Sequence, residues 1–593
     1  MKLRKVSVAE SIIDLPRARL VPDPREVPMD VGRLGALIGG APEQQARVEM
    51  VLSNYLKRGG ALGRMLVEEA GVAERTFADT VSRQLVMPLS DLRSDRPTAD
   101  ALAWVKGADA HRLGLLPLRF STDVLTVAVC DPFDSEMVYF LESLPVIEVH
   151  LKITTASELR SGINHAYPAL DEVNKYLVDF ARSDAAVVGS QVETISASAF
   201  GTDEAPVIQV VNKIVTQALR DRASDVHIEP MDDRVRVRYR IDGALREVLS
   251  LPTEIGPALV SRIKIMADMN IVERRRPQDG QFQVTVDARD LDVRVAITPT
   301  IWGEKTVLRL LDKSRSLYRL SELGMPADSN AIYSRMVRSP FGMLIVSGPT
   351  GSGKTTTLYA TLNEINREDI NVMTIEDPVE YVFPSVNQIQ INDQAGITFA
   401  TGLKSMLRQD PDVILVGEVR DVETARIAVQ SALTGHFVLS SVHATDSVSA
   451  LIRLLDMGIE SFLIAASVMG VVAQRLVRRI CSSCAIEYTP SVADLAVFRS
   501  VIESDKSRFV RGAGCNVCSN TGYYGRVGVY EVLSITEEIR QLVVAGASPR
   551  ELRDCAISQG LRTLRHEAGR MVENDITTID EVIRNVYVSE GML

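Results

Sequence analysis

The residues from Gly348 to Thr356 carry the clearest chemical signal in this sequence. The first eight match the pattern GxxxxGK[ST], in which backbone N–H groups of a glycine-rich loop surround the phosphates of a nucleotide. An apolar run precedes them and a helix-compatible run follows, which is the order that a phosphate site needs. A plain glycine-rich turn is the alternative, and these flanking runs argue against it. We predict nucleotide binding by Gly348, Pro349, Thr350, Gly351, Ser352, Gly353, Lys354, Thr355 and Thr356.

Within this loop, the lysine and the first threonine have separate expected roles. The ammonium group of Lys354 reaches the β- and γ-phosphates, and the Thr355 hydroxyl takes one position around Mg²⁺. The sequence therefore predicts that the chain binds a nucleoside triphosphate together with magnesium.

An enzyme that hydrolyses a nucleotide also needs acidic groups, and two apolar runs lead to such groups. The run at 372–375 leads to Glu376, and the run at 412–416 leads to Glu418. Carboxylates at strand ends polarise water or hold Mg²⁺, either directly or through water. The acidic pair of Glu376 and Asp377 at a strand end would otherwise be a cap, and the neighbouring phosphate loop favours the catalytic interpretation.

Two histidines, His436 and His443, follow the Glu418 run in sequence. A lone histidine is more often a hydrogen-bonded core residue than a catalytic one. An imidazole changes its charge near neutral pH. The position of both histidines directly after the Glu418 run favours a role in sensing the γ-phosphate or in coupling to its loss. Both are therefore candidate catalytic residues.

Four of the six cysteines form two CxxC pairs, Cys481 with Cys484 and Cys515 with Cys518. In a chain without an export signal, this spacing indicates a tetrahedral thiolate zinc site rather than disulfides. No histidine lies between the pairs as a ligand of an open site, so the zinc is expected to be structural. A redox CxxC or a coincidence of spacing is the alternative.

Composition and charge narrow the class of protein. With 66 Lys and Arg against 77 Asp and Glu, the net charge of −11 argues against nucleic-acid binding by charge alone. No apolar run reaches the length of about 18 residues that a membrane helix needs, and the N-terminus lacks the apolar core of a signal peptide. The longest apolar run, residues 462–473, predicts a buried helix. We therefore expect a soluble cytoplasmic protein that meets a membrane only through partners.

The 593 residues predict several domains, and the patterns change along the chain. Residues 1–165 mix helical patterns with β-type runs such as 125–130. Residues 185–204 are rich in Ser, Ala and Gly and predict a linker. Arginines alternate with apolar residues at 234–241, which predicts a strand with one solvated, charged face. Apolar runs alternate with amphipathic stretches from 315 to 470, so we expect a largely parallel α/β sheet.

From about residue 205 to the C-terminus, the sequence resembles the hexameric assembly ATPases of type II secretion and type IV pilus systems. The motifs that carry the resemblance are ASDVHIEP at 223–230, RPQDG at 276–280, the phosphate loop at 348–355, TIEDPVE at 374–380, RQDPD at 408–412, GEVRD at 417–421, the histidines at 436–443 and the four cysteines. The family fold implied is a RecA-like P-loop motor domain of the α/β class, preceded by a smaller PAS-like α/β domain, with a zinc-binding subdomain and a mixed α/β N-terminal domain. The expected boundaries are 1–165 for an N-terminal docking or regulatory domain, 166–204 for a helix and flexible linker, 205–312 for the small domain, and 313–593 for the motor domain, which includes the zinc subdomain at 478–522 and C-terminal helices at 530–593.

The resemblance also implies roles for residues that match the motifs of the family. Glu376 is the general base, and Glu418 is the acidic group near the metal. Arg294 and Arg309, on the small domain, supply positive charge to the active site, where an arginine raises the rate of other NTPases by about 10³–10⁵-fold. Two positions depart from the common pattern: the histidine motif reads SVHAT where TLHTN is commoner, and Gly417 stands where an acidic residue is usual in other P-loop enzymes.

The implied activity is ATP hydrolysis coupled to rotation of the small domain against the motor domain within a homohexamer. Such a ring would move an inner-membrane platform protein that feeds pilin-like subunits into a filament. The cytoplasmic domain of a membrane assembly protein would hold the ring at the inner membrane. ATP, Mg²⁺ and Zn²⁺ are the implied cofactors, and no nucleic acid is expected. The alternatives are a DNA-translocating or conjugative ATPase of the same superfamily and a nucleotide-gated scaffold.

A second ligand is implied for the N-terminal domain. Residues 62–73 resemble one half of the motif by which some related ATPases bind cyclic di-GMP, with Ala61 where the motif has Arg. A second start at Arg33 resembles another copy of the motif. The alternative is a docking domain that grips the cytoplasmic part of an inner-membrane partner.

Overall fold

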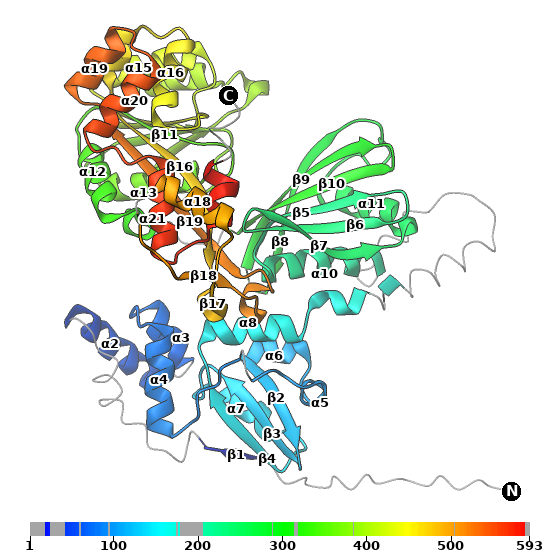
Figure 1. The fold of residues 1–593 in the computed structure, drawn as a ribbon. Helices are drawn as coiled ribbons and strands as arrows, with labels where there is room; N and C mark the ends of the chain where they lie inside the picture. Colours follow the sequence, from blue (N-terminus) through cyan, green and yellow to red (C-terminus); the bar gives the residue numbers. More distant parts are fainter. Residues whose placement is uncertain are drawn as a thin grey trace, which may run out of the picture. The chain divides into compact units, whose positions relative to one another are not determined.

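The computed structural model describes residues 18–23, 42–58, 61–92, 95–173, 176–177, 206–287, 289–312, 318–383, 385–502 and 504–587. The chain divides into two compact units, Met1–Asp221 with Cys515–Asn520, and Arg222–Gly514 with Thr521–Leu593. Both units combine helices with sheets, in agreement with the predicted α/β class (Figure 1). The predicted linker at 185–204 and the motif start at Arg33 lie outside the described residues.

The N-terminal unit contains a four-stranded mixed sheet in the order β1-β4-β3-β2. β2 and β3 form an antiparallel pair, and β3, β4 and β1 run parallel. The strand predicted at 125–130 is confirmed as β3. The strands are β1 (Arg19–Val21), β2 (Leu115–Ser121), β3 (Val124–Val129) and β4 (Glu148–Ile153), and the helices are α2 (Pro42–Arg58), α3 (Leu62–Glu68), α4 (Glu74–Leu85), α5 (Ala99–Leu102), α6 (Gly107–Leu113), α7 (Ser135–Glu142), α8 (Ala156–Ala166) and α10 (Pro206–Arg220).

The second unit begins with a six-stranded antiparallel sheet in the order β7-β6-β5-β10-β9-β8. This sheet and α11 (Gly256–Met266) are called the small domain below. Its strands are β5 (Ala223–Pro230), β6 (Val235–Ile241), β7 (Ala244–Leu251), β8 (Gln278–Val286), β9 (Arg289–Thr300) and β10 (Gly303–Asp312).

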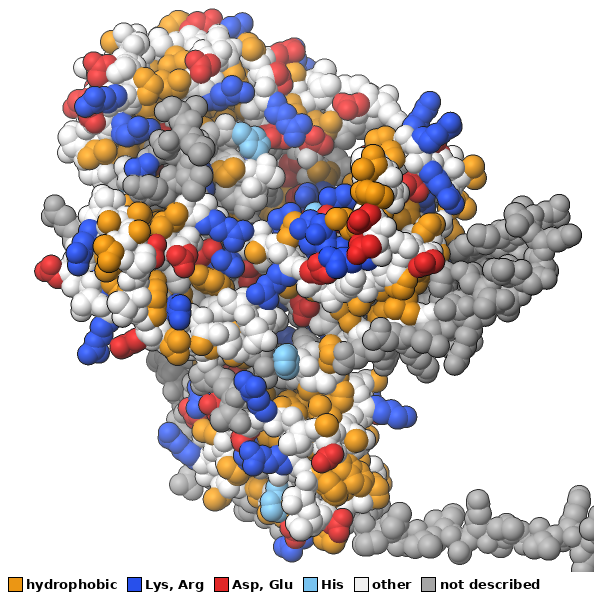
Figure 2. Space-filling model, turned by 45° about the vertical axis from the view of Figure 1, so that its right-hand side comes forward, with side chains coloured by type: hydrophobic (Ala, Val, Ile, Leu, Met, Phe, Trp, Pro, Cys, Tyr) orange, Lys and Arg blue, Asp and Glu red, His pale blue; other side chains and the backbone are white. Residues whose placement is uncertain are grey.

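One face of the small-domain sheet is charged, as the alternating arginines predicted. Along β6 the apolar side chains are buried and the arginines between them are half-buried. Arg236 and Arg238 lie 3.0 and 2.8 Å from the Glu229 carboxylate on β5, and Arg240 lies 3.5 Å from Asp225. These arginines are paired with carboxylates instead of forming a purely basic surface. Acidic and basic side chains are similarly interspersed over the face drawn in Figure 2.

The rest of the second unit is built on a seven-stranded sheet in the order β13-β12-β14-β15-β11-β16-β19. All neighbours run parallel except β16 and β19, which confirms the prediction of a largely parallel sheet. The strands are β11 (Gly342–Ser347), β12 (Val372–Glu376), β13 (Asn387–Gln390), β14 (Val413–Val416), β15 (Phe437–Val442), β16 (Val468–Ile480) and β19 (Tyr523–Ser534). Every residue of β11 and β15 is buried, as expected for parallel strands covered on both faces.

Two hydrophobic cores cover the two faces of this sheet. Met343 and Ile345 of β11 belong to one core, and Leu344 and Val346 belong to the other, because successive side chains of a strand point to opposite faces. The helices of this domain, called the motor domain below, are α12 (Ala327–Val337), α13 (Lys354–Ile365), α14 (Phe399–Met406), α15 (Val422–Leu433), α16 (Ser447–Asp456), α17 (Ser461–Ser467), α18 (Val492–Val501), α19 (Glu537–Val544), α20 (Pro549–Ser558), α21 (Leu564–Glu573) and α22 (Ile579–Val582). A small two-stranded sheet, β17 (Ala485–Tyr488) with β18 (Phe509–Gly512), lies between β16 and β19 in sequence.

The prediction of one buried helix at 462–473 is wrong in its second half. The helix α17 ends at Ser467, and β16 begins at Val468 and pairs with β11 and β19. A short, continuously apolar run has no periodicity that separates a buried helix from a buried strand, and the β-branched Val468, Val471 and Val472 favour the strand. Within the ranges described above, each helix is too short or too polar to cross a lipid bilayer.

Candidate active site

The glycine-rich loop at 348–353 joins the end of β11 to the start of α13. Gly351 and Gly353 have φ angles of 78° and 89°, in the left-handed region that favours glycine. A Cβ at Gly348 would lie 2.4 Å from the Ser352 Oγ, so this position has no room for a side chain. The backbone geometry therefore suits a loop that surrounds phosphate groups beside the N-terminus of a helix.

The Lys354 ammonium group lies against this loop. It donates hydrogen bonds to the carbonyl oxygens of Gly348 at 2.9 Å and Pro349 at 3.2 Å. Burial lowers the pKa of Lys354, and the Glu418 carboxylate acts in the opposite direction. Phosphate oxygens carry charge and are stronger hydrogen-bond acceptors than carbonyl oxygens. Lys354 can therefore leave the loop carbonyls and bind a phosphate group instead.

Gln474, on β16, supports the loop from the neighbouring strand. Its Nε2 donates to the Ser352 carbonyl at 2.7 Å, and its Oε1 accepts from the Thr357 hydroxyl at 2.8 Å. The Gln474 side chain is fully buried, so both bonds are shielded from water. The loop and the first helical turn remain open to solvent at Pro349, Thr350, Gly351, Thr355 and Thr356.

Glu376 ends β12 and is 4% exposed. Its carboxylate accepts hydrogen bonds from the Thr374 hydroxyl at 2.6 Å, from the Gln388 amide at 3.1 Å and from the Tyr359 hydroxyl. Tyr359 lies on α13, the helix that begins with Lys354, so this bond joins the phosphate-loop helix to the carboxylate. Burial and the Glu376 carboxylate both raise the pKa of Tyr359, and the phenol therefore stays a neutral donor.

Glu418 follows β14, and His443 follows β15. The Glu418 Oε2 lies 3.3 Å from the His443 Nε2, and Arg420 pairs with the other carboxylate oxygen. Arg420 also lies 3.6 Å from Asp377, the residue after Glu376. The parallel register of the strands brings these groups to the edge of the sheet at which the phosphate loop follows β11.

His436 lies at the opposite edge of the same sheet, directly before β15. Its Nδ1 is 3.0 Å from the Ser431 carbonyl oxygen and 3.2 Å from the Thr434 hydroxyl, beside the C-terminal end of α15. Its own carbonyl accepts a hydrogen bond from the Gly342 N–H at 3.1 Å. His436 therefore lies beside the first residue of β11, whereas the phosphate loop follows the last residue of that strand. Within one chain, the length of β11 separates the two. The structure thus brings His443, and not His436, to the candidate site.

The two arginines predicted on the small domain lie opposite each other on β9 and β10. Both terminal nitrogens of Arg294 lie 3.3 Å from carboxylate oxygens of Glu380, which follows Glu376 in the motor domain. Arg309 pairs within the small domain, where its Nε donates to Asp225 at 3.1 Å. Arg294 therefore reaches the loop after Glu376, whereas Arg309 stays on its own sheet.

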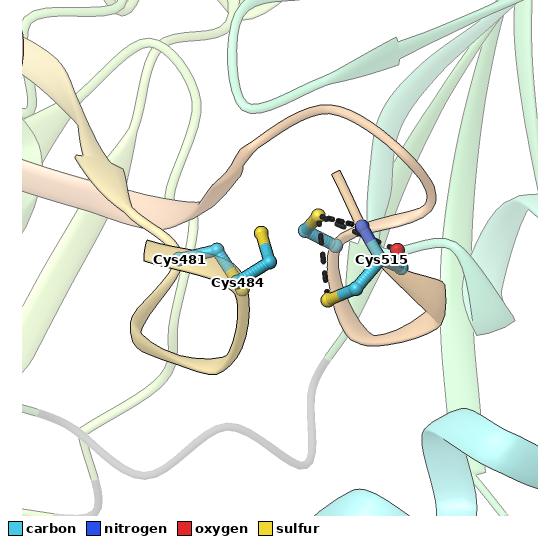
Figure 3. A group of neighbouring side chains, drawn as sticks. Cys481, Cys484 and Cys515 are labelled. Atoms are coloured by element: carbon cyan, nitrogen blue, oxygen red, sulfur yellow. Dashed lines mark hydrogen bonds between the residues drawn. The ribbon is translucent and has the colours of Figure 1, made fainter. Parts of the chain in front are cut away.

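The four cysteines lie together, and Figure 3 shows the labelled side chains facing one another. The sulfur atoms of Cys481, Cys484, Cys515 and Cys518 all lie within 4.8 Å of one another. Cys515 Sγ and Cys518 Sγ are 3.8 Å apart, the spacing of two thiolates bound tetrahedrally at about 2.3 Å from one Zn²⁺. The Gly514 N–H donates to Cys484 Sγ at 3.3 Å, a bond that suits a thiolate ligand. The donor set and its spacing fit a zinc ion.

The sequence model of the type II/IV secretion system protein family matches residues 201–584, which is more than half of the chain. The chain belongs to this family. Membership confirms the resemblance that the motifs carried and the prediction of a secretion or pilus assembly ATPase with a P-loop motor domain.

Individual relatives agree with the family assignment. Type IV pilus assembly ATPase PilB of Myxococcus xanthus is 39% identical over 565 residues, which cover 93% of this chain and 99% of that protein. Type II secretion system protein HxcR of Pseudomonas aeruginosa is 47% identical over 382 residues, which cover 64% of this chain and 78% of that protein. Type II secretion system protein E of Xanthomonas campestris is 38% identical over 519 residues, which cover 86% of this chain and 91% of that protein.

A sequence model of the MshEN domain matches residues 85–173 of this family member. The half-motif at 62–73 precedes that range, and its Gly63 N–H donates to the Asp131 carboxylate at 2.7 Å. Burial raises the pKa of Asp131 to about 6, against the effect of this hydrogen bond. The glycine of the half-motif is therefore tied to the loop after β3, inside the matched range.

Sequence reasoning did not identify four residues of this site: Tyr359, Glu380, Arg420 and Gln474. Glu380 and Arg420 stand inside the quoted motifs, and their charge next to catalytic candidates was an available signal. Tyr359 gave a weaker signal as a polar-tipped aromatic residue on the phosphate-loop helix. Gln474 gave none, because the strand that carries it lies far from the loop in sequence.

We expect Gln474→Ala to weaken ATP binding about tenfold, because two buried hydrogen bonds that shape the loop are lost at about 0.5–1.5 kcal/mol each. Isothermal titration with ATP and Mg²⁺ measures the effect. Gln430→Ala, at an exposed position on α15, is the matched control and should bind ATP normally. Equal affinity of both variants would show that the loop keeps its shape without Gln474.

Proposed function

We propose that this chain is an ATP-hydrolysing motor that powers the assembly of a type II secretion pseudopilus or a type IV pilus. The observation that carries the proposal is the meeting of the phosphate loop, Glu376 and Glu418 at one sheet edge in a member of this family. PilB of Myxococcus xanthus, which matches nearly the whole length of this chain, is named a type IV pilus assembly ATPase.

The residues at this edge divide the chemistry between them. Lys354 holds the β- and γ-phosphates, the Thr355 hydroxyl and Glu418 hold Mg²⁺ directly or through water, and Glu376 accepts a proton from the attacking water. Bound Mg²⁺ neutralises charge on the phosphate oxygens. His443 is placed by its contact with Glu418 to respond when that carboxylate changes its interactions.

Arg294 is proposed to couple the nucleotide to the small domain. Its guanidinium group, on the small domain, faces the carboxylate of Glu380 on the motor domain. A bound γ-phosphate offers more negative charge than that carboxylate, so Arg294 would move to it and draw the small domain toward the motor domain. Arg309 lies next to Arg294 on the sheet. When Arg309 leaves Asp225 for the nucleotide, it adds positive charge near the phosphates. Loss of the γ-phosphate returns both arginines to their carboxylates.

The motor acts as a homohexamer, in the cytoplasm at the inner membrane, on an inner-membrane platform protein and beside the cytoplasmic domain of a membrane assembly protein. The domain division given above, with the motor domain at 313–593, belongs to this proposal. The chain has 77 acidic and 66 basic residues, and Figure 2 shows acidic and basic side chains interspersed on one face. This charge opposes a DNA-translocating function.

Two ligands complete the proposal. The four-cysteine cluster holds a structural Zn²⁺, because its sulfur atoms have the spacing of a thiolate site. Four thiolates fill the tetrahedral coordination of the zinc and leave no position for a substrate. The N-terminal domain docks on a membrane partner or binds cyclic di-GMP through residues 62–73. Binding of this nucleotide is a prediction from the sequence.

For Glu376→Gln we expect unchanged ATP affinity and a kcat lower by about 10²–10⁴-fold, which is the usual contribution of a general base. A coupled assay of phosphate release measures kcat, and titration measures affinity. Glu364→Gln, an exposed substitution on α13, is the matched control and should keep full activity. Full activity of the Glu376→Gln variant would remove Glu376 from the mechanism, and filament assembly by an inactive variant would support the scaffold alternative.

We expect about one zinc ion per purified chain by elemental analysis. Cys484→Ser should lower the zinc content and the thermal unfolding temperature, because folding of a thiolate site is linked to metal binding. Cys555→Ser, outside the cluster, should change neither. If the native protein contained no zinc while all its cysteines were reduced, the zinc site would be contradicted. The CxxC pairs would then be explained as a redox pair or as a coincidence of spacing.

A further inference from the structure

Tyr359 lies on the phosphate-loop helix α13 and packs against the loop that follows Glu376. Its side chain is 3% exposed, although it ends in a polar hydroxyl. That hydroxyl meets the Glu376 carboxylate on one side and the backbone N–H of Glu380 at 3.2 Å on the other. A buried hydroxyl with two partners has one defined orientation.

The direction of both bonds follows from the chemistry of the partners. The Glu380 backbone N–H is only a donor, so the Tyr359 oxygen accepts there. The phenolic hydrogen is then directed at the Glu376 carboxylate, which is only an acceptor when ionised. Burial keeps Tyr359 protonated by raising its pKa, so the donor is present at neutral pH.

The ring of Tyr359 is fixed as firmly as its hydroxyl. Phe383 packs edge-on against it with ring centroids 5.1 Å apart, and Tyr381 does so at 6.1 Å. Both residues belong to the same loop as Glu380. The loop therefore surrounds the phenol, and a shift of the loop must move the ring or break these contacts.

The same loop carries the contact with the small domain. The Glu380 side chain pairs with Arg294 at 3.3 Å, and its backbone N–H binds the Tyr359 oxygen. A continuous series of polar contacts thus leads from Arg294 through Glu380 and Tyr359 to Glu376. Each link is a hydrogen bond or an ion pair, and the residues that form them are buried or half-buried.

We propose that Tyr359 is a positioning residue, which orients the Glu376 carboxylate and makes that orientation depend on the contact between Arg294 and Glu380. It touches neither nucleotide nor water in this role and acts only through Glu376. The inference rests on the proposed role of Glu376 as the base. When Arg294 leaves Glu380, the ion pair no longer fixes the Glu380 end of the loop. The orientation of the Glu376 carboxylate then depends on its hydrogen bonds from Tyr359, Thr374 and Gln388.

The test is a double-mutant cycle of Tyr359→Phe and Glu376→Gln in the full-length chain. We expect Tyr359→Phe to keep the KM and the affinity for ATP while kcat falls about tenfold, within the loss of about 10²-fold that a misplaced catalytic group can cause. In the Glu376→Gln background the same change should have no further effect on kcat, because Tyr359 acts through that carboxylate.

Tyr333→Phe is the matched control. Tyr333 is buried on α12, and its hydroxyl lies 2.5 Å from the Thr361 hydroxyl on α13, so it loses an equivalent bond to the same helix. We expect this variant to keep kcat even where its unfolding temperature falls.

The outcomes separate the two ideas. An unchanged kcat for Tyr359→Phe beside an inactive Glu376→Gln variant would overturn the positioning role and leave the base intact. Equal losses for the two tyrosine variants, or a further loss in the Glu376→Gln background, would also overturn it, because packing alone would then explain the effect. An active Glu376→Gln variant would instead contradict the proposed base.

Discussion

The parallel register of β11, β12, β14 and β15 is the constraint on which the chemistry of this chain depends. Their carboxyl ends meet at one edge of the sheet, so the phosphate loop, Glu376, Glu418 and His443 lie close in space although long stretches of sequence separate them. Because successive side chains point to opposite faces, a shift of one residue in any strand would exchange its two faces and misplace the groups at its end. The two apolar cores on the faces of the sheet prevent such a shift.

The same register explains the support of the loop by β16. Ser347 of β11 pairs with Ala473, so Gln474 is the next residue along the neighbouring strand and lies beside the loop as it turns away. A strand that pairs in parallel on one side and antiparallel with β19 on the other is rigid enough to hold a buried amide in place. The loop is thus shaped by its own glycines and by a side chain from an adjacent strand.

Arg294 and Glu380 connect this edge to a second domain. An arginine facing a carboxylate can be drawn away by a group with more negative charge, and the side chains of Arg294 and Glu380 are 27% and 28% exposed, so water reaches part of the ion pair. The contact is therefore suited to exchange, whereas the buried bonds around Glu376 are suited to hold one geometry. A motor needs both kinds of contact, because one must change with the nucleotide and the other must survive each cycle.

Local patterns predicted the parts of this molecule that depend on local chemistry. The glycine loop, the alternation in β6 and the two CxxC pairs each require particular residues at fixed spacing, and the structure contains the corresponding turn, strand and cysteine cluster. The change from α17 to β16 was missed, because an apolar run satisfies both conformations and pairing with β11 decides between them. Sequence order does not show that the two ends of β15 lie at opposite edges of the sheet, which is what separates His436 from His443. The contact of Gln474 with Ser352 spans 122 positions, and only the folded sheet brings the two together.

Coupling of this motor to its nucleotide requires that bound ATP draws Arg294 away from Glu380. The most direct test is an experimental structure of the Glu376→Gln variant with ATP and Mg²⁺ bound, in which the turnover is stopped. We expect the Arg294 guanidinium to lie within hydrogen-bond distance of a phosphate oxygen and to have lost its contact with Glu380. A structure with the nucleotide in the loop and Arg294 still paired with Glu380 would contradict it.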